Sequence, residues 1–384
     1  MIYLDNSATT KPAPEAAAAI ARVLTEDFGN PSALYRVGLN AEKILKQARE
    51  EVARSLECKP AEVTFTSCGT ESNNTVLKGV WKSRKRQGKR MITTSVEHPA
   101  ILRVCEELEH EGADVVYLPV HSDGTFDMET FDAALNADTI LVSVMYVNNE
   151  SGAVMPVREI AAKAHALGNG CLVHTDAVQA YGKLNCSVRE LGVDFLSLSG
   201  HKVHGPKGVG ALYVKSGLHI PAFMLGGGQE AGFRSGTENT PGIAGLGAAA
   251  GLLNACWRNN AAKMAETRAY LKERIISEIP DVRINSPEDG APSVLNVSFI
   301  GCRAEVLLHQ LEGDEIYVST GSACSSKKKG SHVLTAMGLR PEEIEGAVRF
   351  SFCADNTIEQ MDTVIEKLKL YTASQRRLRK AFRK

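Results

Sequence analysis

The chain has 384 residues, of which 43% are hydrophobic, enough to bury the cores of one large and one smaller domain. Its 44 basic and 45 acidic side chains leave a net charge of −1, which argues against direct nucleic-acid binding and favours a small-molecule substrate. Nine cysteines without a C-x-x-C pair indicate a reducing compartment, so we expect a cytoplasmic protein with neither a disulfide framework nor a bound metal.

The chain shows no segment typical of membrane insertion. Its first ten residues, MIYLDNSATT, lack a basic region followed by an apolar run, so we expect no signal peptide. The longest uncharged stretch, residues 239–257, contains Pro241 and four glycines. We therefore expect a closely packed helix there and no membrane span.

Apolar, β-rich runs alternate with segments of helical period over the first 214 residues. We expect strands at 62–67, 91–95, 114–119, 139–147, 171–176, 194–199 and 209–214. Helices are expected at 70–87, from residue 99 onward and at 158–167. This alternation predicts an α/β fold with a mostly parallel sheet flanked by helices, and a ligand at the carboxyl ends of the strands.

The pattern changes after residue 240. A helix of small residues begins near Pro241 and a charged helix follows it, then come expected strands at 292–300, 316–320 and 346–352, a helix at 303–311 and a final helix. These segments predict a smaller α+β domain. We expect a large domain at 15–253, and a small domain built from residues 1–14 and 254–384.

Two loops after expected strands carry candidate binding residues. In FTSCGTESNN, Gly69 and Thr70 open a helix whose free amides could bind an anion, although an ordinary capped helix explains the motif equally well. In HTDAVQ, Asp176 and Gln179 follow a buried strand. Asp176 could cap the next helix or pair with a protonated ring nitrogen in a cleft.

A third loop, SLSGHKVHGPKG, places Lys202 between two histidines and among glycines. A lone lysine is usually a solvated surface charge. At the end of an apolar run, however, partial burial lowers the pKa of a lysine and makes it a usable nucleophile. Ser199 and His201 beside it could donate hydrogen bonds to an anion.

These three loops fit one cofactor. Pyridoxal 5'-phosphate needs a lysine for its Schiff base, an acid opposite its ring nitrogen, an anion cradle and a flat group over its ring. The sequence also resembles the class V, fold type I pyridoxal phosphate enzymes, and among them the cysteine desulfurases of the NifS/IscS type. The resemblance rests on blocks along nearly the whole chain, in this order: YLDNSATT, FGNPSALYRVG, FTSCGTESNN, EHPA, VNNESG, HTDAVQ, SGHKVHGPKG, FRSGTEN, STGSACSS and VRFSF.

The resemblance implies a role for each matching residue. Lys202 would hold the cofactor covalently, Asp176 would hold the proton of the ring nitrogen, and His98 of EHPA would stack on the ring and move protons. Without the resemblance, His98 is equally a capping residue before Pro99. The phosphate would be bound by Gly69, Thr70, Ser199 and His201, joined by Thr237 from the partner subunit of a homodimer.

The substrate contacts are also implied by the resemblance. Asn149 and Gln179 would contact the hydroxyl side of the ring, and Asn149 would lie beside the substrate. Arg349 would clamp the substrate carboxylate with two parallel hydrogen bonds. On the alternating strand pattern alone, Arg349 could equally be a surface arginine.

Cys324 lies in STGSACSSKKKG, among small polar residues and before Lys327, Lys328 and Lys329. Such surroundings predict an exposed loop, and nearby lysines favour the thiolate. The resemblance implies that Cys324 attacks the sulfur of L-cysteine, giving L-alanine and a persulfide. The sulfur would pass to an acceptor protein, such as an iron-sulfur scaffold or a tRNA-thiolation enzyme.

Three features depart from the family pattern. Tyr35 stands where many relatives have histidine, the three lysines after Cys324 are unusually basic, and the C-terminus lacks the longer tail of some scaffold-binding relatives. Two enzymatic alternatives, a selenocysteine lyase and a class V aminotransferase, share the cofactor site. The presence of Cys324 favours the cysteine desulfurase over the aminotransferase, because transamination needs no thiol. A non-catalytic sulfur-carrier scaffold would predict loss of Lys202 or Asp176, and both are present.

Overall fold

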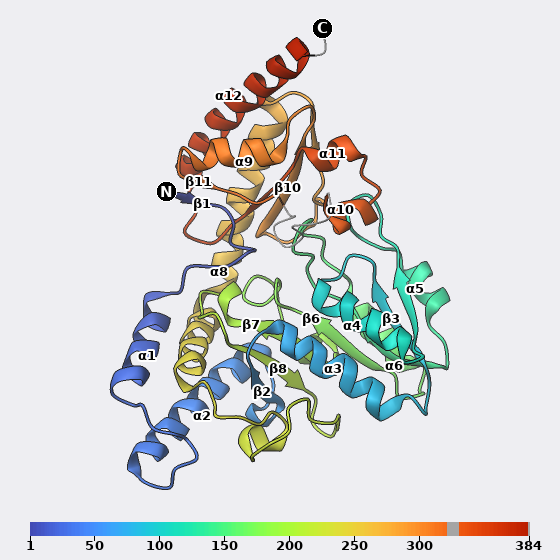
Figure 1. Ribbon diagram of the computed structural model, residues 1–384, viewed down its shortest axis with the longest axis vertical. Coiled ribbons are helices and arrows are strands. Elements are labelled where there is room, and N and C mark those ends of the chain that lie inside the picture. Colours follow the sequence, from blue (N-terminus) through green and yellow to red (C-terminus); the bar gives the residue numbers. More distant parts are fainter. Residues whose placement is uncertain (321–329, 383–384) are drawn as a thin grey trace.

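The computed structural model describes residues 1–320 and 330–382, which include a seven-stranded sheet (Figure 1). Its strands follow the order β2-β8-β7-β6-β5-β3-β4, and β8 is antiparallel to its two neighbours while the other neighbouring pairs are parallel. The strands are β2 (Val63–Thr66), β3 (Arg90–Thr94), β4 (Asp114–Leu118), β5 (Thr139–Ser143), β6 (Leu172–Asp176), β7 (Phe195–Ser199) and β8 (Gly210–Val214). The predicted α/β fold with a mostly parallel sheet is confirmed.

Helices cover both faces of this sheet because its central strands are apolar on both sides. Neighbouring residues of a strand point to opposite faces, so Leu172 and Val173 of β6 belong to two different cores. One core contains residues of α3 (Gly69–Arg84) and α4 (Pro99–His110). The other contains residues of α2 (Arg36–Leu56), α5 (Met128–Ala134), α6 (Val157–Ala166), α7 (Val188–Leu191) and α8 (Thr240–Glu278).

A three-stranded antiparallel sheet of order β12-β10-β9 lies in the last third of the chain. Its strands are β9 (Val282–Ile284), β10 (Val294–Phe299) and β12 (Ala347–Ser351). Together with the C-terminal half of α8, α9 (Ala304–Glu312) and α12 (Ile358–Phe382), they form a third core that also buries Leu4. Two shorter helices, α10 (His332–Ala336) and α11 (Pro341–Glu345), precede β12.

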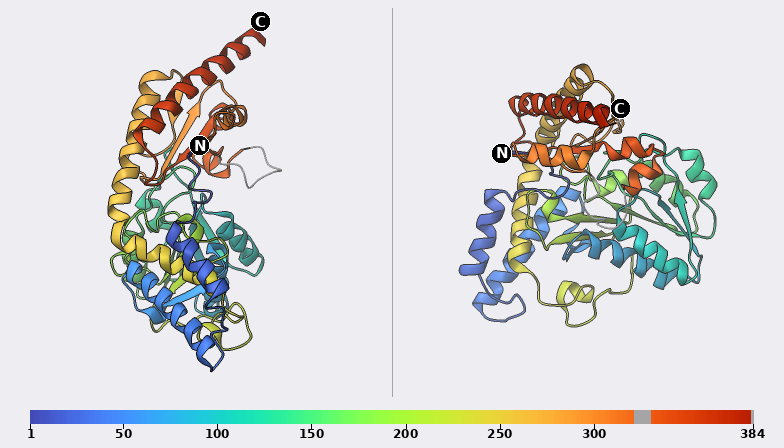
Figure 2. Two further views of the ribbon diagram at one scale, coloured as in Figure 1. Left: turned by 90° about the vertical axis from the view of Figure 1, so that its left-hand side faces the viewer. Right: turned by 45° about the horizontal axis from the view of Figure 1, so that its top comes forward.

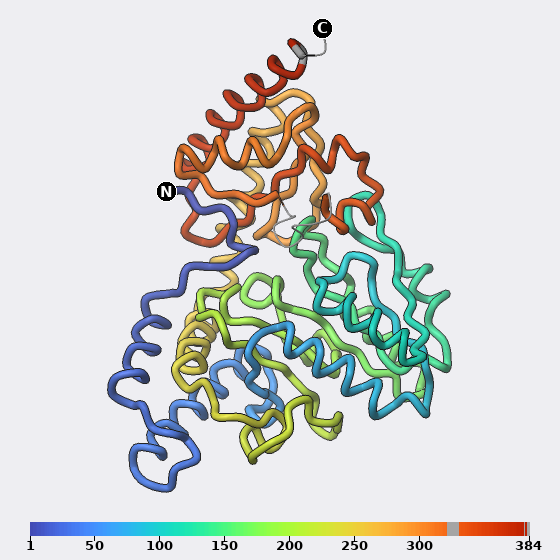
Figure 3. Tube along the Cα trace, in the orientation of Figure 1, coloured from blue at the N-terminus to red at the C-terminus, as the bar shows by residue number. Residues whose placement is uncertain are grey.

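The N-terminal segment lies against this last third of the chain (Figure 3). Strand β1 (Ile2–Tyr3) pairs in parallel with β11 (Ile316–Tyr317), and the chain then crosses to α1 (Pro14–Thr25), which packs on α8. Three short 3₁₀ turns complete the elements: η1 (Pro60–Glu62), η2 (Gly200–Lys202) and η3 (Gln229–Gly232). Within the described ranges, the chain has no helix long and apolar enough to cross a membrane.

The expectation of two helices after residue 240 is wrong, because α8 is one continuous helix of 39 residues (Figure 2). Pro241 lies in its first turn, where proline is tolerated, and no glycine or proline interrupts residues 252–278. The composition changes because the surroundings change: the small residues pack on α1 and α2, and the later half reaches the third core. The domain boundaries at residues 14 and 253 stay a prediction.

Candidate functional site

A cavity of about 350 Å³ lies at the carboxyl ends of β6 and β7. Among the predicted site residues that the structure describes, all except Thr237 line it. The lining residues are Ser7, Ala8, Cys68, Gly69, Thr70, Asn73, His98, Met145, Val147, Asn149, Asp176, Val178, Gln179, Ser199, His201, Lys202, Ser319 and Arg349. Residues from the whole length of the chain therefore meet in one hollow, while their individual roles stay predictions.

Lys202 enters the cavity from the 3₁₀ turn η2, directly after β7. Its Nζ donates hydrogen bonds to two backbone carbonyls of the N-terminal segment, Ser7 O at 2.5 Å and Ala8 O at 2.8 Å. The segment is fixed in turn to the same loop, because Thr10 N donates to His201 O at 2.8 Å. The amine of Lys202 is thus oriented by contacts with residues that lie more than 190 positions away in the sequence.

Asp176 ends β6 and is buried, with both carboxylate oxygens accepting hydrogen bonds. Asn73 Nδ2 donates to Oδ2 at 2.7 Å, and the backbone N–H of Val178 donates to Oδ1 at 3.0 Å. Two donors on a buried carboxyl group hold its orientation. Asp176 can therefore present a fixed acceptor to a protonated nitrogen in the cavity.

The turn before α3 has the features of an anion site. No side chain caps the first amides of this helix, which carry the positive end of its dipole. A Cβ built on Gly69 would lie 2.6 Å from the Val178 side chain, so this turn has no room for a larger residue. Across from it, Ser199 Oγ is buried without a hydrogen-bond partner among the described residues, as expected of a group that serves a ligand.

His98 caps α4 and also lines the cavity. Its Nδ1 accepts a hydrogen bond from Ala100 N at 3.1 Å, so the proton of the neutral ring lies on Nε2. Burial lowers the pKa of His98, the charge of Asp176 opposes this shift, and Lys202 and His332 add to it. The ring is therefore held neutral in one tautomer.

Glu97 beside His98 is fully buried, and burial raises its pKa to about 8. Its Oε1 accepts hydrogen bonds from Thr94 Oγ1 and Met145 N at 2.8 and 2.9 Å. His332 Nε2 lies 3.0 Å from the backbone oxygen of Glu97. Glu97 thus ties the segment that carries His98 to the strands behind it.

Arg349 reaches the cavity from β12 and its side chain is only 6% exposed. Its Nη1 donates to the backbone oxygen of Asn149 at 2.9 Å, and its Nη2 donates to Asp5 Oδ1 at 2.7 Å. Its Nε is buried and has no partner among the described residues. The guanidinium is anchored on one side and keeps N–H groups for a carboxylate.

Gln179 and His201 complete the wall beside Lys202. Gln179 Nε2 donates to Ser7 O at 2.9 Å, and its Oε1 accepts from the buried Lys183 Nζ at 3.5 Å. Burial lowers the pKa of Lys183 to about 7, with a further contribution from the charge of Lys202. Burial likewise lowers the pKa of His201 to about 4, so its ring is neutral near pH 7.

Two residues singled out in the sequence lie elsewhere. Thr237 is exposed on the loop between η3 and α8 and does not line the cavity of its own chain. Tyr35 is 66% exposed at the start of α2. Cys324, with Lys327 to Lys329, lies outside the described residues.

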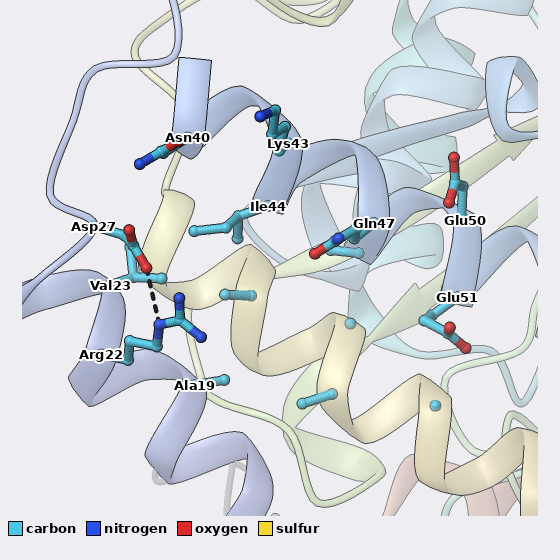
Figure 4. Close-up of a pocket in the computed structure, with 15 residues that line it drawn as sticks. Ala19, Arg22, Val23, Asp27, Asn40, Lys43, Ile44, Gln47, Glu50 and Glu51 are labelled. Carbon is cyan, nitrogen blue, oxygen red and sulfur yellow. Dashed lines mark hydrogen bonds and ion pairs between the residues drawn. The ribbon is translucent and has the colours of Figure 1, made fainter. Parts of the chain in front are cut away.

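A second hollow, of about 760 Å³, lies between α1, α2 and α8 (Figure 4). Its floor is built of small α8 residues such as Ala244 and Gly247, and Arg22 and Asp27 form an ion pair at its edge. None of the predicted site residues lines it. We therefore place the functional site in the smaller cavity, where the titratable groups converge.

Sequence reasoning missed several residues that shape this cavity: Asp5, Ser7, Asn73, Glu97 and Lys183. For Asn73 a signal was available, because it lies four residues after Gly69 and hence on the same face of α3. Glu97 is the first residue of the EHPA motif, in which a role was predicted for His98 alone. The contacts of Asp5 and Ser7 carry no local signal, since their partners lie far away in sequence.

Comparisons with known proteins agree with this geometry. Residues 2–364 match the aminotransferase class-V family. A cysteine desulfurase of Nostoc sp. is 42% identical over 368 residues, which cover 95% of this chain and 91% of the relative.

Two solved structures extend the likeness to the fold. A NifS-like protein superposes with a TM-score of 0.91 at 37% identity, over 97% of this chain and 99% of the other. SspA in complex with cysteine superposes with a TM-score of 0.82 at 34% identity, over 93% of this chain and all of the other. The chain therefore belongs to the aminotransferase class-V family and, within it, to the cysteine desulfurases.

Proposed function

We propose that this protein is a pyridoxal 5'-phosphate-dependent cysteine desulfurase. It converts L-cysteine to L-alanine and transfers the sulfur to Cys324 as a persulfide. The observation that carries the proposal is the convergence of Lys202, Asp176, His98 and Arg349 on one cavity. The relatives named cysteine desulfurase, which match 95% of the chain, support the same reaction.

The residues of the cavity fit the cofactor. The uncapped start of α3 and the unpartnered Ser199 Oγ suit a phosphate, with Gly69, Thr70 and His201 around it. Lys202 would hold the cofactor covalently, Asp176 would face its ring nitrogen, and Asn149 and Gln179 would lie on its hydroxyl side. When bound, the cofactor supplies an electron sink for the carbanion that forms at the α-carbon of the substrate.

The other groups bind the substrate and move protons. Arg349 would receive the carboxylate of L-cysteine on the N–H groups that its anchors leave available. His98 holds a proton on Nε2 and can pass it to a neighbouring base or carbanion. Lys202, when it does not hold the cofactor, would be a second base beside the α-carbon of the substrate.

Cys324 supplies the sulfur acceptor. It follows Ser319, which lines the cavity, by five residues, and five residues span at most about 18 Å when extended. Its thiolate attacks the substrate sulfur and an S–S bond forms. The bond between the sulfur and the β-carbon breaks and its electron pair stays with the substrate. The β-carbon takes up a proton, which gives L-alanine.

The persulfide then passes to an acceptor protein, which we propose to be an iron-sulfur scaffold or a tRNA-thiolation enzyme. We further propose a cytoplasmic homodimer in which Thr237 of each subunit serves the site of the other. The exposure of Thr237, outside its own cavity, supports this arrangement.

The test is the Cys324→Ser variant, because serine is nearly isosteric but a poor nucleophile toward sulfur. We expect normal cofactor binding, measured by visible absorbance, and a loss of alanine formation from L-cysteine on the order of 100-fold or more. Cys256→Ser is the matched control, since Cys256 lies on α8, away from the cavity, where its Sγ donates to Leu252 O and accepts from Asn260 Nδ2.

Both L-cysteine and L-selenocysteine should be assayed on each variant. Loss of activity on L-cysteine alone supports the desulfurase, because selenium can leave without a thiol acceptor. Alanine formation from L-cysteine at the wild-type rate by Cys324→Ser would rule out the proposed mechanism and favour another class V activity.

A further inference from the structure

Asp5 holds the arginine that faces the substrate, although it does not line the cavity itself. Its Oδ1 accepts a hydrogen bond from Arg349 Nη2 at 2.7 Å, and the two groups form an ion pair. Among the described residues, this is the one ion pair that Arg349 makes. A buried guanidinium without a counter-charge would be costly, so Asp5 has an electrostatic reason to be there.

The backbone fixes where the Asp5 side chain points. Asp5 forms a parallel bridge with Ser351, and Asn6 N donates to Ser351 O at 3.2 Å. Ser351 lies two residues after Arg349 on β12, so their side chains leave the strand on the same face. Asp5 is therefore held beside the guanidinium by main-chain contacts and not only by the ion pair.

The Asp5 contact determines which edge of the guanidinium is available. One N–H of Nη2 is directed to Asp5 and one N–H of Nη1 to the backbone oxygen of Asn149. The N–H of Nε is buried and unpartnered among the described residues. Nε and Nη2 share one edge of the guanidinium, and that edge has the spacing to bind a carboxylate through two parallel hydrogen bonds.

We propose that Asp5 is a positioning residue for the substrate: it holds the Arg349 guanidinium so that its Nε–Nη2 edge receives the carboxylate of the amino-acid substrate. This inference rests on the proposed function. It adds a residue that determines the preference for a free carboxylate, and it joins the first residues of the chain to the substrate site.

The test compares L-cysteine with L-cysteinamide, which keeps the amine and the thiol but has no carboxylate. The measured quantity is the ratio of kcat/KM for the two substrates. In Asp5→Ala we expect this ratio to fall about tenfold or more, chiefly through KM for L-cysteine, because a charge-assisted hydrogen bond no longer orients Arg349. Asp5→Asn keeps an oxygen acceptor and should retain the ratio within about threefold.

Asp27→Ala is the matched control, because Asp27 accepts from Arg22 Nε at 2.9 Å far from the cavity (Figure 4). This variant should leave the ratio unchanged. If Asp5→Ala does not fold, Asp5→Glu provides the test instead. The added methylene displaces the carboxylate that accepts from Arg349, so the ratio of the two kcat/KM values should fall.

An unchanged ratio in the folded Asp5→Ala or Asp5→Glu variant would overturn the inference. So would an Asp5→Asn variant as impaired as Asp5→Ala, because a hydrogen-bond acceptor at this position would then not be enough to orient Arg349. A wild-type protein that forms no alanine from L-cysteine would instead overturn the proposed function, so the two failures are distinguishable.

Discussion

Asn73 is the side chain that fixes the Asp176 carboxylate, through its 2.7 Å hydrogen bond. We predict that Asn73→Ala lowers kcat/KM for L-cysteine about tenfold, because Asp176 loses a buried donor that orients it. Asn73→Asp should be more severe, since two carboxylates at this distance repel each other strongly. Steady-state kinetics and the dissociation constant of the cofactor measure both effects.

The neighbouring Asn74 offers a matched control. It is half-buried, does not line the cavity and donates to the backbone oxygen of Thr70 on its own helix, so Asn74→Ala should retain activity within about twofold. Equal losses in the two alanine variants would show that the hydrogen bond to Asp176 is not what matters.

His174 makes the stability of the protein sensitive to acid. It is buried in β6 between Ser143 Oγ and Ser197 Oγ, and burial lowers its pKa to about 3. The unfolded chain therefore binds a proton below about pH 6.5 while the folded chain does not, so the free energy of unfolding falls as the pH drops from about 6.5 toward 3. We predict a shallower fall in His174→Gln.

Urea denaturation at several pH values between 4 and 8 measures this effect. His110→Gln provides the control, because His110 is exposed at the end of α4. Parallel pH profiles for wild type and His174→Gln would contradict the assignment of the acid sensitivity to His174.

At the residue scale, sequence reasoning placed Lys202, Asp176, His98 and Arg349 in one site, and the cavity brings them together. The motifs of Asp176 and Lys202 combine an unusual residue type with a position at the end of a strand, whereas the roles of His98 and Arg349 were implied by the family resemblance. It could not find Asp5, because an acid near the N-terminus gives no sign that it bonds an arginine 344 residues later. Such contacts depend on how the two sheets and the N-terminal segment are packed.

At the element scale, strand β2 forms one edge of the seven-stranded sheet, and an ion pair covers it. Arg49 donates to Glu230 at 2.7 Å and also to Val63 O, while Glu230 Oε2 accepts from Phe65 N at 3.0 Å. The pair thus satisfies backbone groups that an open sheet edge would leave exposed. It also fixes the loop that leads to Thr237, where Glu230 and Ala231 adopt left-handed backbone angles.

We predict that Glu230→Ala lowers the free energy of unfolding by roughly 3 kcal/mol, because Arg49 keeps a largely buried charge without a partner. The Glu230 side chain is only 3% exposed, which limits solvent screening. Proteolysis within residues 219–239 should also become faster. Glu106→Ala, which removes an exposed pair with Arg103, should change stability by less than about 1 kcal/mol. Equal stability of the two variants would contradict the edge role of Glu230.

Element prediction succeeded where the hydrophobic period was strong and failed where composition changed within one helix. The strands of the main sheet were all expected, because each is a short apolar run between turn residues. Helix α8 was divided in two because its small residues give way to charged ones. The helix continues without a break, and only its surroundings change, which no local pattern reveals.

At the scale of the whole molecule, one loop bears on the proposed homodimer. Arg234 pairs with Glu71 at 2.8 Å in the first turn of α3, beside the proposed phosphate site, and Thr237 follows on an exposed stretch. The loop is therefore anchored to its own subunit, while Thr237 is exposed and does not line its own cavity. The proposed homodimer can therefore be tested by enzyme activity, without knowledge of how the two subunits are arranged.

Two inactive variants should restore activity when their subunits are mixed. Lys202→Ala removes the catalytic lysine but keeps Thr237, and Thr237→Asp repels the phosphate but keeps Lys202. In a mixed dimer, one site then combines an intact Lys202 with an intact Thr237 from the other subunit, so random reassociation should recover about a quarter of wild-type activity per subunit. Alanine formation after mild denaturation and joint refolding measures this recovery, and each variant refolded alone is the control. If Thr237 served its own subunit, each site of the mixed dimer would carry one defect, and no activity would return.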